Sequence, residues 1–327
     1  MLILSLQDLP NLRSIDVSNS KYLIETPKFF WTPKLERLDF TGCTNLIQVH
    51  PSIGHLTELV FLSLQNCSSL VNLDFGRVSN LHFLRVLRLS GCTKLEKTPD
   101  FTGASNLEYL DMDGCTSLST VHESIGALAK LRFLSLRDCK ILVEIPNSIN
   151  NMTSLVTLDL CGCLKLATLP LSWSLSSSRL NSLIVLDVSF CNLYDLPAAI
   201  GKLQCLERLS LQGNSIDVLP SSISKLRCLA YLNLAHCRKL QTLPHKHTLN
   251  APSLVGSYFK MTLGSRDHRS GIYIFDCPEL KFSLFDHQEY FCQYITRWFQ
   301  RLIQVSTLNN IFSLIYLVQS RCTIQHS

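Results

Sequence analysis

Long apolar runs are absent from this 327-residue chain. The longest run in its last part, 311–318, is interrupted by Ser313 and is far shorter than the roughly 20 residues of a membrane-spanning helix. The opening residues MLILSLQDLPNL lack the basic segment and the small-residue cleavage site of a signal peptide. We therefore expect a chain of the cytoplasm, or of the cytoplasm and nucleus, that has no membrane partner.

Charge of one sign is also scarce. The 30 basic and 25 acidic residues leave a net charge of +5, and like charges do not gather in blocks. A dedicated nucleic-acid-binding domain carries a stronger and more clustered positive charge. The phosphate-binding motif G-x-x-x-x-G-K-[ST] is missing from the sequence, so nucleotide binding is not predicted. We expect no nucleic-acid partner and no cofactor on this chain.

What the sequence has in abundance is an internal repeat. The template L-x-x-L-x-L-x-x-(C/N) fits ten times, and successive copies begin 23 to 28 residues apart. This period lies in the range of roughly 20–29 residues that is typical of leucine-rich repeats. The leading leucines are Leu12, Leu35, Leu59, Leu84, Leu107, Leu131, Leu155, Leu183, Leu206 and Leu229.

The L-x-L part of each copy alternates apolar and polar residues, as a strand with one buried face does. In the second copy, Leu38 and Phe40 are expected to point inward, whereas Arg37, Asp39 and Thr41 face solvent. A single repeat cannot bury its apolar side alone, so the repeats must stack and share one core. We predict an α/β fold, a leucine-rich-repeat solenoid shaped as a curved horseshoe, with a parallel sheet on its concave side.

The segments between the predicted strands repeat as well. Five of them share the pattern I-x-x-(L/M)-x-x-L, which predicts a short helix or a 3₁₀ turn on the convex side. These five segments span residues 51–59, 123–131, 147–155, 198–206 and 221–229. Two others, 26–35 and 98–107, are rich in proline or glycine and are predicted to lack a helix.

The repeats set the predicted domain organisation. Residues 1–250 are expected to form the solenoid, with about ten repeats. The serine-rich segment 172–180 predicts an exposed insertion between the seventh and eighth copies. Residues 251–327 form a weakly specified second segment, in which 271–280 has the pattern of a strand and turn and 286–304 that of an amphipathic helix.

Cysteine fills the last template position in eight of the ten copies, with Asn in the ninth and Ser in the first. All three residue types are small and can hydrogen-bond to the backbone. We predict that this column, here called the cysteine ladder, satisfies backbone donors that lose their partners where each strand ends. Its members are Cys43, Cys67, Cys92, Cys115, Cys139, Cys163, Cys191, Asn214 and Cys237.

Other uses of these cysteines fit the pattern less well. Neighbouring ladder positions would place their Cβ atoms about 4.8 Å apart, too far for an unstrained disulfide. The close pair Cys161 and Cys163 has no His or Cys at the spacing of a zinc site. Nucleophilic catalysis requires one cysteine beside a base, and not eight equivalent buried ones. We therefore expect neither a metal site nor an enzymatic activity.

Three longer stretches carry a family resemblance: LRLSGCTKLEKTPDF (87–101), LERLSLQGNSIDVLPSSISKL (206–226) and LAYLNLAHCRKLQTLP (229–244). With them, the chain resembles the leucine-rich-repeat region of plant intracellular immune receptors of the TIR–nucleotide-binding–leucine-rich-repeat class. The resemblance implies a recognition module that binds a pathogen effector or a guarded host protein through its concave face and restrains a nucleotide-binding domain. Because such a domain and the TIR domain are missing, it implies a fragment or a truncated relative.

Two alternatives stay open at this point. The substrate-recognition repeats of F-box-type ubiquitin ligases also carry cysteine at the ladder position, although their return segments are longer helices. A stand-alone leucine-rich-repeat scaffold would have the same repeat template.

Exposed strand positions are the candidate partner-binding residues. In four successive copies, the column before the second leucine is apolar or aromatic, which is typical of a protein interface, although neighbouring side chains could partly bury it. The next column is mostly polar and places Asp159 beside Asp187, with Arg88 and Arg137 expected to offset nearby acids. The candidates are Phe61, Arg88, Tyr109, Asp111, Phe133 and Arg137.

Overall fold

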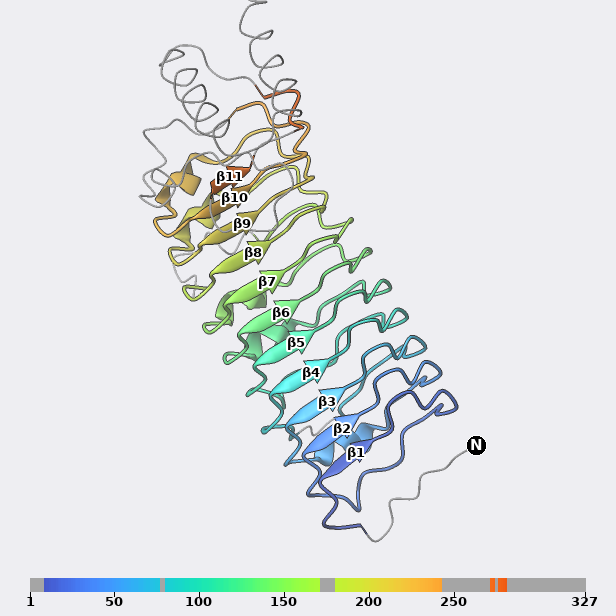
Figure 1. The fold of residues 1–327 in the computed structure, drawn as a ribbon. Helices are drawn as coiled ribbons and strands as arrows, with labels where there is room; N and C mark the ends of the chain where they lie inside the picture. The colour runs from blue at the N-terminus through green and yellow to red at the C-terminus, as the bar shows by residue number, and fades with distance from the viewer. Residues whose placement is uncertain (1–8, 77–79, 171–179, 243–270, 274–275, 281–327) are drawn as a thin grey trace, which may run out of the picture. The chain divides into compact units, whose positions relative to one another are not determined.

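A computed structural model describes residues 9–76, 80–170, 180–242, 271–273 and 276–280, all of which belong to one compact unit, Met1–Leu280. Its strands form one open, parallel sheet in which strand order follows chain order (Figure 1). The strands are β1 (Ser14–Asp16), β2 (Arg37–Asp39), β3 (Phe61–Ser63), β4 (Val86–Arg88), β5 (Tyr109–Asp111), β6 (Phe133–Ser135), β7 (Thr157–Asp159), β8 (Val185–Asp187), β9 (Arg208–Ser210), β10 (Tyr231–Asn233) and β11 (Gly271–Tyr273). The predicted leucine-rich-repeat solenoid is confirmed.

Each strand is three residues long. From β2 to β10, the central leucine of every strand is buried, and from β2 to β9 it stands in register with the leucine of the next strand. Leu38 and Phe40 are fully buried as predicted, and the leading Leu35 joins them. The stack of leucines is one continuous core that no single repeat could build.

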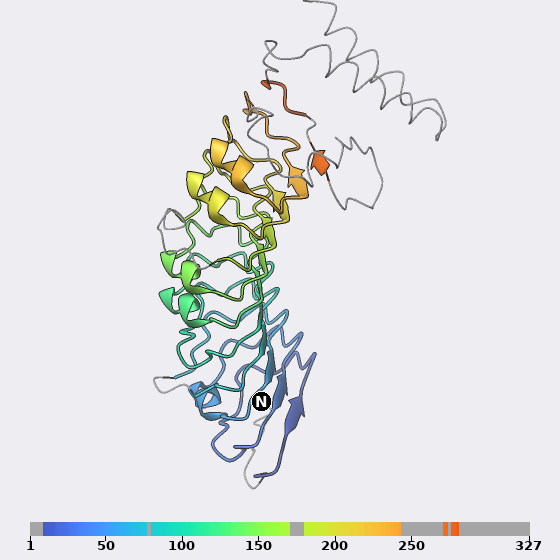
Figure 2. The same ribbon diagram turned by 90° about the vertical axis from the view of Figure 1, so that its left-hand side faces the viewer.

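The five segments with the I-x-x-(L/M)-x-x-L pattern all contain a 3₁₀ helix, as predicted. They are η1 (Pro51–His55), η2 (Glu123–Ala127), η3 (Asn147–Asn151), η5 (Ala198–Lys202) and η6 (Ser221–Lys225). Figure 2 shows these helices on the side of the repeats away from the sheet. In each helix the pattern isoleucine is buried, so the helix covers the far side of the core.

The two segments predicted to lack a helix, 26–35 and 98–107, have none. Each instead buries a phenylalanine in the core, Phe29 in the first and Phe101 in the second. The backbone N–H of each phenylalanine donates to a serine of the following repeat, to Ser52 Oγ at 2.9 Å and to Ser124 Oγ at 2.8 Å. A side chain from the next repeat thus replaces the hydrogen bond that a helix would have supplied.

The cysteine ladder is buried along its length, but its hydrogen bonds run opposite to the prediction. Each thiol donates to the backbone carbonyl oxygen at the end of the preceding repeat's strand, with Sγ–O distances of 3.1 to 3.4 Å. Cys67 Sγ, for example, lies 3.2 Å from Phe40 O, which also accepts the N–H of Cys43 at 3.1 Å. The prediction of an unmet donor was wrong, because within each tight turn the N–H of the ladder residue already bonds to the carbonyl at the end of its own strand. That carbonyl oxygen has a second lone pair, and the thiol of the next repeat donates to it.

Asn214 takes the place of a ladder thiol in the ninth repeat and forms more hydrogen bonds than a thiol does. Its Nδ2 donates to Val188 O and Leu211 O, both at 2.8 Å, while its Oδ1 accepts the N–H of Leu193 at 3.1 Å. The ladder also continues beyond the last predicted member, because Cys277 Sγ donates to Leu234 O at 3.2 Å.

The predicted strand within 271–280 is present as β11, which pairs with β10 in parallel register. The predicted domain boundary at residue 250, the serine-rich segment 172–180 except for its last residue, and the helix at 286–304 lie outside the described residues. No described helix combines the length and the apolar character that crossing a bilayer requires.

The residue before each ladder position has a positive φ, so the backbone turns there in the left-handed region. Glycine, asparagine, aspartate or histidine fills this position in every repeat but one, since these residues tolerate that region best. The exception is Phe190, with φ 52°, whose ring lies over Gly213 of the next repeat. A Cβ on Gly213 would lie 2.6 Å from the ring, so only glycine fits beneath it.

Replacing Cys92 tests the ladder. Cys92→Ser keeps a small donor for Leu64 O and is expected to cost about 1 kcal/mol of unfolding free energy. Cys92→Arg forces an unpaired charge into a fully buried position and is expected to cost several times more, on the order of 4 kcal/mol. Equilibrium denaturation of both variants measures the difference, and a stable Cys92→Arg chain would show that the ladder is not core.

Candidate interaction surface on the sheet

From β1 to β10, the first and third residues of each strand point to the side of the sheet away from the core, which we call the sheet face. On it, Phe61, Val86, Tyr109 and Phe133 are register partners across β3, β4, β5 and β6. We call these four residues the aromatic stripe. All four residues are half-buried.

Contacts within the stripe explain this partial burial. The rings of Tyr109 and Phe133 are stacked, with centroids 4.5 Å apart and an interplanar angle of 4°. The Arg37 guanidinium lies 3.7 Å from the centroid of the Phe61 ring. Arg88 lies between the Phe61 and Tyr109 rings, at 5.6 and 5.8 Å. Cations and rings therefore form one preorganised row from β2 to β6, held by cation–π and stacking contacts.

Next to this row, β5 to β8 carry an acidic group of four carboxylates, Asp111, Asp113, Asp159 and Asp187, with Arg137 among them. Arg137 Nη1 lies 3.2 Å from Asp159 Oδ2, which confirms that this arginine offsets an acid. Asp159 and Asp187 are register partners, as predicted. Asp113 accepts hydrogen bonds from the Ser135 hydroxyl and from the Arg137 N–H.

Crowding and burial perturb two of these carboxyl groups. Burial raises the pKa of Asp113, and the nearby Asp111 adds to the effect. Burial likewise raises the pKa of Asp159, with a further contribution from Asp187. The pKa of Arg137 is raised as well, chiefly by Cys161 and then by Asp159 and Asp187. Four carboxyl groups thus face one arginine, and burial together with the neighbouring carboxylates disfavours the ionised form of two of them.

The structure gathers the predicted partner-binding residues into two neighbouring parts of one face. Phe61, Arg88, Tyr109 and Phe133 lie in or on the aromatic stripe, while Asp111 and Arg137 lie in the acidic group. Within the described residues Arg88 forms no ion pair, so its expected role in offsetting an acid is replaced by its contacts with rings. Their role in binding a partner stays a prediction.

Arg37 was not among the candidates, although it makes the shortest cation–ring contact of the face. Its sequence position, one strand before Phe61 in the same column, was the available signal. The apolar and aromatic residues of this column begin at Phe61, and the stem and guanidinium of Arg37 continue the row by one strand.

The chemistry of the ladder thiols fits a structural role. Burial raises the pKa of Cys67 and of Cys163 to about 12. Burial also raises the pKa of Cys161, which lies among the acids of the sheet face, to about 11. These groups stay protonated at neutral pH, as a thiol that donates a hydrogen bond must. In the part of the chain that the structure describes, no three His, Cys, Asp or Glu residues come together as a metal site.

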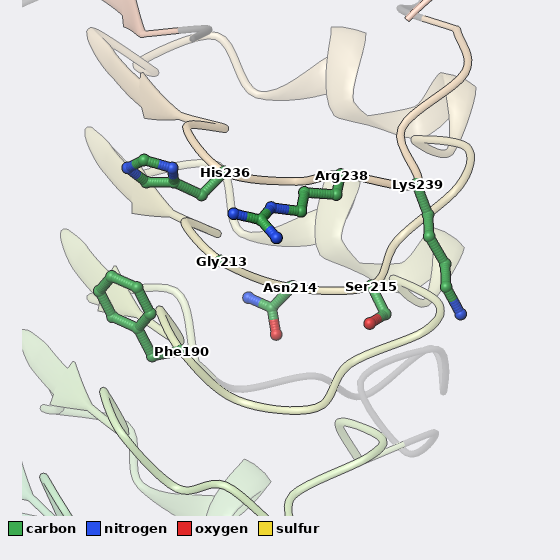
Figure 3. A pocket seen from close by; sticks show the side chains of 7 residues that line it. All are labelled: Phe190, Gly213, Asn214, Ser215, His236, Arg238 and Lys239. Carbon is green, nitrogen blue, oxygen red and sulfur yellow. The ribbon is translucent and has the colours of Figure 1, made fainter. Parts of the chain in front are cut away.

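A hollow of about 560 Å³ lies at the turns that follow β8, β9 and β10, and it was not predicted. Figure 3 shows its side chains coming from these three successive turns. The lining residues are Phe190, Gly213, Asn214, Ser215, His236, Arg238 and Lys239. The available signal was Phe190 itself, an aromatic residue at a position where every other repeat has glycine, asparagine, aspartate or histidine.

Comparisons with known proteins agree with this geometry. A family model described as leucine rich repeat matches residues 181–238, and a second of the same description matches residues 130–152. The TMV resistance protein N of Nicotiana glutinosa is 33% identical over 287 residues, covering 72% of this chain and 25% of that protein. Disease resistance protein RPP2A of Arabidopsis thaliana is 36% identical over 125 residues, covering 38% of this chain and 9% of that protein.

The chain is a leucine-rich-repeat protein homologous to plant disease resistance proteins. It spans about a quarter or less of the length of these relatives. Among solved structures, the functional domain of InlJ from Listeria monocytogenes, which includes a cysteine ladder, matches with a TM-score of 0.51 and 18% identity. That match covers 83% of this chain and 55% of the InlJ domain, and it shows the shared repeat fold.

The raised pKa of Asp159 predicts a pH-dependent stability. The folded state favours the protonated form of the Asp159 carboxyl. Ionised Asp159 therefore lowers the free energy of unfolding at pH values above its folded pKa. This loss of stability disappears below the unfolded pKa of about 3.9, where the carboxyl is protonated in both states. Asp159→Asn should therefore raise the melting temperature at neutral pH by roughly 2 °C. Melting curves across the acid range should show the gain shrinking towards about pH 3. A gain that does not change with pH would contradict this account.

The positive φ of Phe190 predicts a stabilising substitution. Phe190→Asn supplies the residue found at this position in the first and third repeats, Asn19 and Asn66. Relief of the left-handed strain should raise the unfolding free energy by about 1 kcal/mol. The reverse change, Asn66→Phe, is the matched control and should lower it by a similar amount. Denaturant titration compares the two, and a destabilised Phe190→Asn variant would show that packing of the ring outweighs its strain.

Proposed function

We propose that this chain is the recognition and regulatory module of an intracellular plant immune receptor, and that it binds a protein partner through the sheet face. The partner is a pathogen effector or a guarded host protein. Homology to plant disease resistance proteins supports the biological setting, and the aromatic stripe is the observation that supports the binding surface.

The stripe has the composition of a protein-binding centre. Aromatic residues and arginine are enriched among the few residues that dominate the energetics of protein interfaces. Here Tyr109 and Phe133 are already stacked, and Arg37 already covers Phe61. A partner would therefore meet side chains that hold their positions before binding.

The charges of the sheet face add orientation. Arg88 lies on β4, Arg37 lies on β2 where it pairs with Asp39 at 2.9 Å, and the acidic group lies over β5 to β8. A protein with the opposite order of charges would be steered onto the face in one direction, since complementary potentials raise the association rate and disfavour wrong partners.

In the full-length receptor, a nucleotide-binding domain is the second partner in this proposal. The chain would restrain that domain until the effector or host protein is bound. The repeats themselves bind and do not catalyse, and the proposed location is the cytoplasm, or the cytoplasm and nucleus. Homology to resistance proteins that are three or more times longer supports a role as one part of such a receptor.

Capture experiments test this function. The wild-type chain and a Phe61→Ala, Tyr109→Ala, Phe133→Ala variant would be used to capture proteins from plant leaf extract with and without pathogen challenge. We expect a protein whose capture falls at least roughly tenfold with the variant, in line with the loss of interface hot spots. Its identity as an effector or a host protein would then be read by mass spectrometry.

Two controls keep the result interpretable. Val185→Ala lies in the same strand column outside the stripe and should leave capture unchanged. Thermal melting of the triple variant should stay close to that of the wild type. Equal capture by the wild type and a folded triple variant would rule out the stripe as the binding site, and a collapsed melt would assign the rings to the core.

A further inference from the structure

Two thiols stand apart from the buried ladder. Cys205 and Cys228 are exposed, whereas every ladder thiol is buried or half-buried. Each lies one residue before a leading leucine, Leu206 or Leu229, in the turn that follows η5 or η6. They therefore hold equivalent positions in the ninth and tenth repeats.

Contacts on both sides of these turns hold them next to each other. Before the cysteines, η5 and η6 touch so closely that a Cβ on Gly201 would lie 2.4 Å from Ser222 O. After them, the N–H of Ala230 donates to Glu207 O at 2.8 Å. Figure 2 shows η5 and η6 side by side. The repeat spacing of about 4.8 Å falls within the Cα separation that disulfides allow, roughly 4.4–6.8 Å, but it exceeds their usual Cβ separation of roughly 3.5–4.5 Å. The two exposed turns must therefore draw together by a few tenths of an ångström for the bond to form, a shift that the buried strand ends of the ladder cannot make.

In other repeats, side chains one residue before the leading leucine contact the turn of the preceding repeat. Lys34 Nζ lies 2.9 Å from Asn11 Oδ1, and both residues precede a leading leucine. Ser182 Oγ lies 2.8 Å from Thr153 O, in the turn of the preceding repeat. A side chain in this column therefore reaches the turn of the preceding repeat, and Cys228 stands in this column beside the turn that carries Cys205.

We propose that Cys205 and Cys228 are a reactive dithiol that a peroxide converts to a disulfide joining the ninth and tenth repeats. The first sulfur attacks a peroxide oxygen; the O–O bond breaks, and a sulfenic acid and one water form when the oxidant is hydrogen peroxide. The second sulfur attacks the sulfenic sulfur; the S–S bond forms, the S–O bond breaks, and a second water leaves with the remaining proton. The two thiols lose two electrons, which the peroxide takes up.

The position of this pair sets its consequences. The bond would lie beside η5 and η6, away from the sheet face, so it would leave the aromatic stripe open. It would tie two neighbouring repeats together and resist their separation on unfolding. Exposed disulfides are readily reduced, so a dithiol reductant should restore both thiols.

Peptide mapping of the full chain tests the proposal. After hydrogen peroxide treatment and alkylation of the remaining thiols, trypsin should release peptides 203–208 and 228–238 as one species lacking two hydrogen atoms. Fragment ions distinguish Cys228 from Cys237, which lies in the second peptide. We expect the linked species in roughly half of the chains or more, and its loss on treatment with dithiothreitol.

Cys205→Ser and Cys228→Ser should each abolish the linked species, while Cys161→Ser, at a thiol that is 7% exposed, should leave it unchanged. Oxidised wild-type protein should also melt at a higher temperature than reduced protein, and neither exposed-cysteine variant should show that rise. Separate peptides in a folded chain, or links only between two chains, would overturn the proposal.

Discussion

Each repeat of this protein has to cover the apolar edge of the repeat before it without leaving a buried backbone group unpaired. The turn at the end of every strand is where this requirement is hardest to meet, because the strand carbonyl enters the core there. Phe40 O shows the solution: it accepts the N–H of its own turn and the thiol of the next repeat. This bond ties neighbouring repeats together at the same point throughout the stack.

The backbone groups of the turns find their hydrogen-bond partners inside the core, so the residues of the sheet face are not required for this pairing and their types can vary. Its strand residues carry little of the core, and the repeats can place aromatic rings, arginines and carboxylates there in any order. The row from Arg37 to Phe133 and the acids around Arg137 are the result. Phe190 is the opposite case, because a bulky residue occupies a strained turn position there. Its ring lies over Gly213, and glycine fits beneath the ring because it has no Cβ.

Cysteine serves two purposes in one chain, and the environment separates them. Thiols at strand ends are enclosed by leucines, which raises the pKa and keeps the proton needed for a hydrogen bond. Thiols one residue before a leading leucine face solvent, where oxidants reach them. The same period that stacks the first group also aligns the second.

The repeat period by itself determined the architecture: strand positions, core leucines, the ladder and the five 3₁₀ helices follow from residue types recurring at fixed spacing. Local patterns suffice for these because the same contact recurs in every repeat. Only the tertiary structure decided which atom the ladder thiols bond, since a donor and an acceptor both end the strand. It also decided that Arg88 contacts rings and not an acid, that Cys277 extends the ladder, and that Phe190 lines a hollow. These outcomes depend on side chains from different repeats meeting in space, which the order of residues in one repeat does not encode.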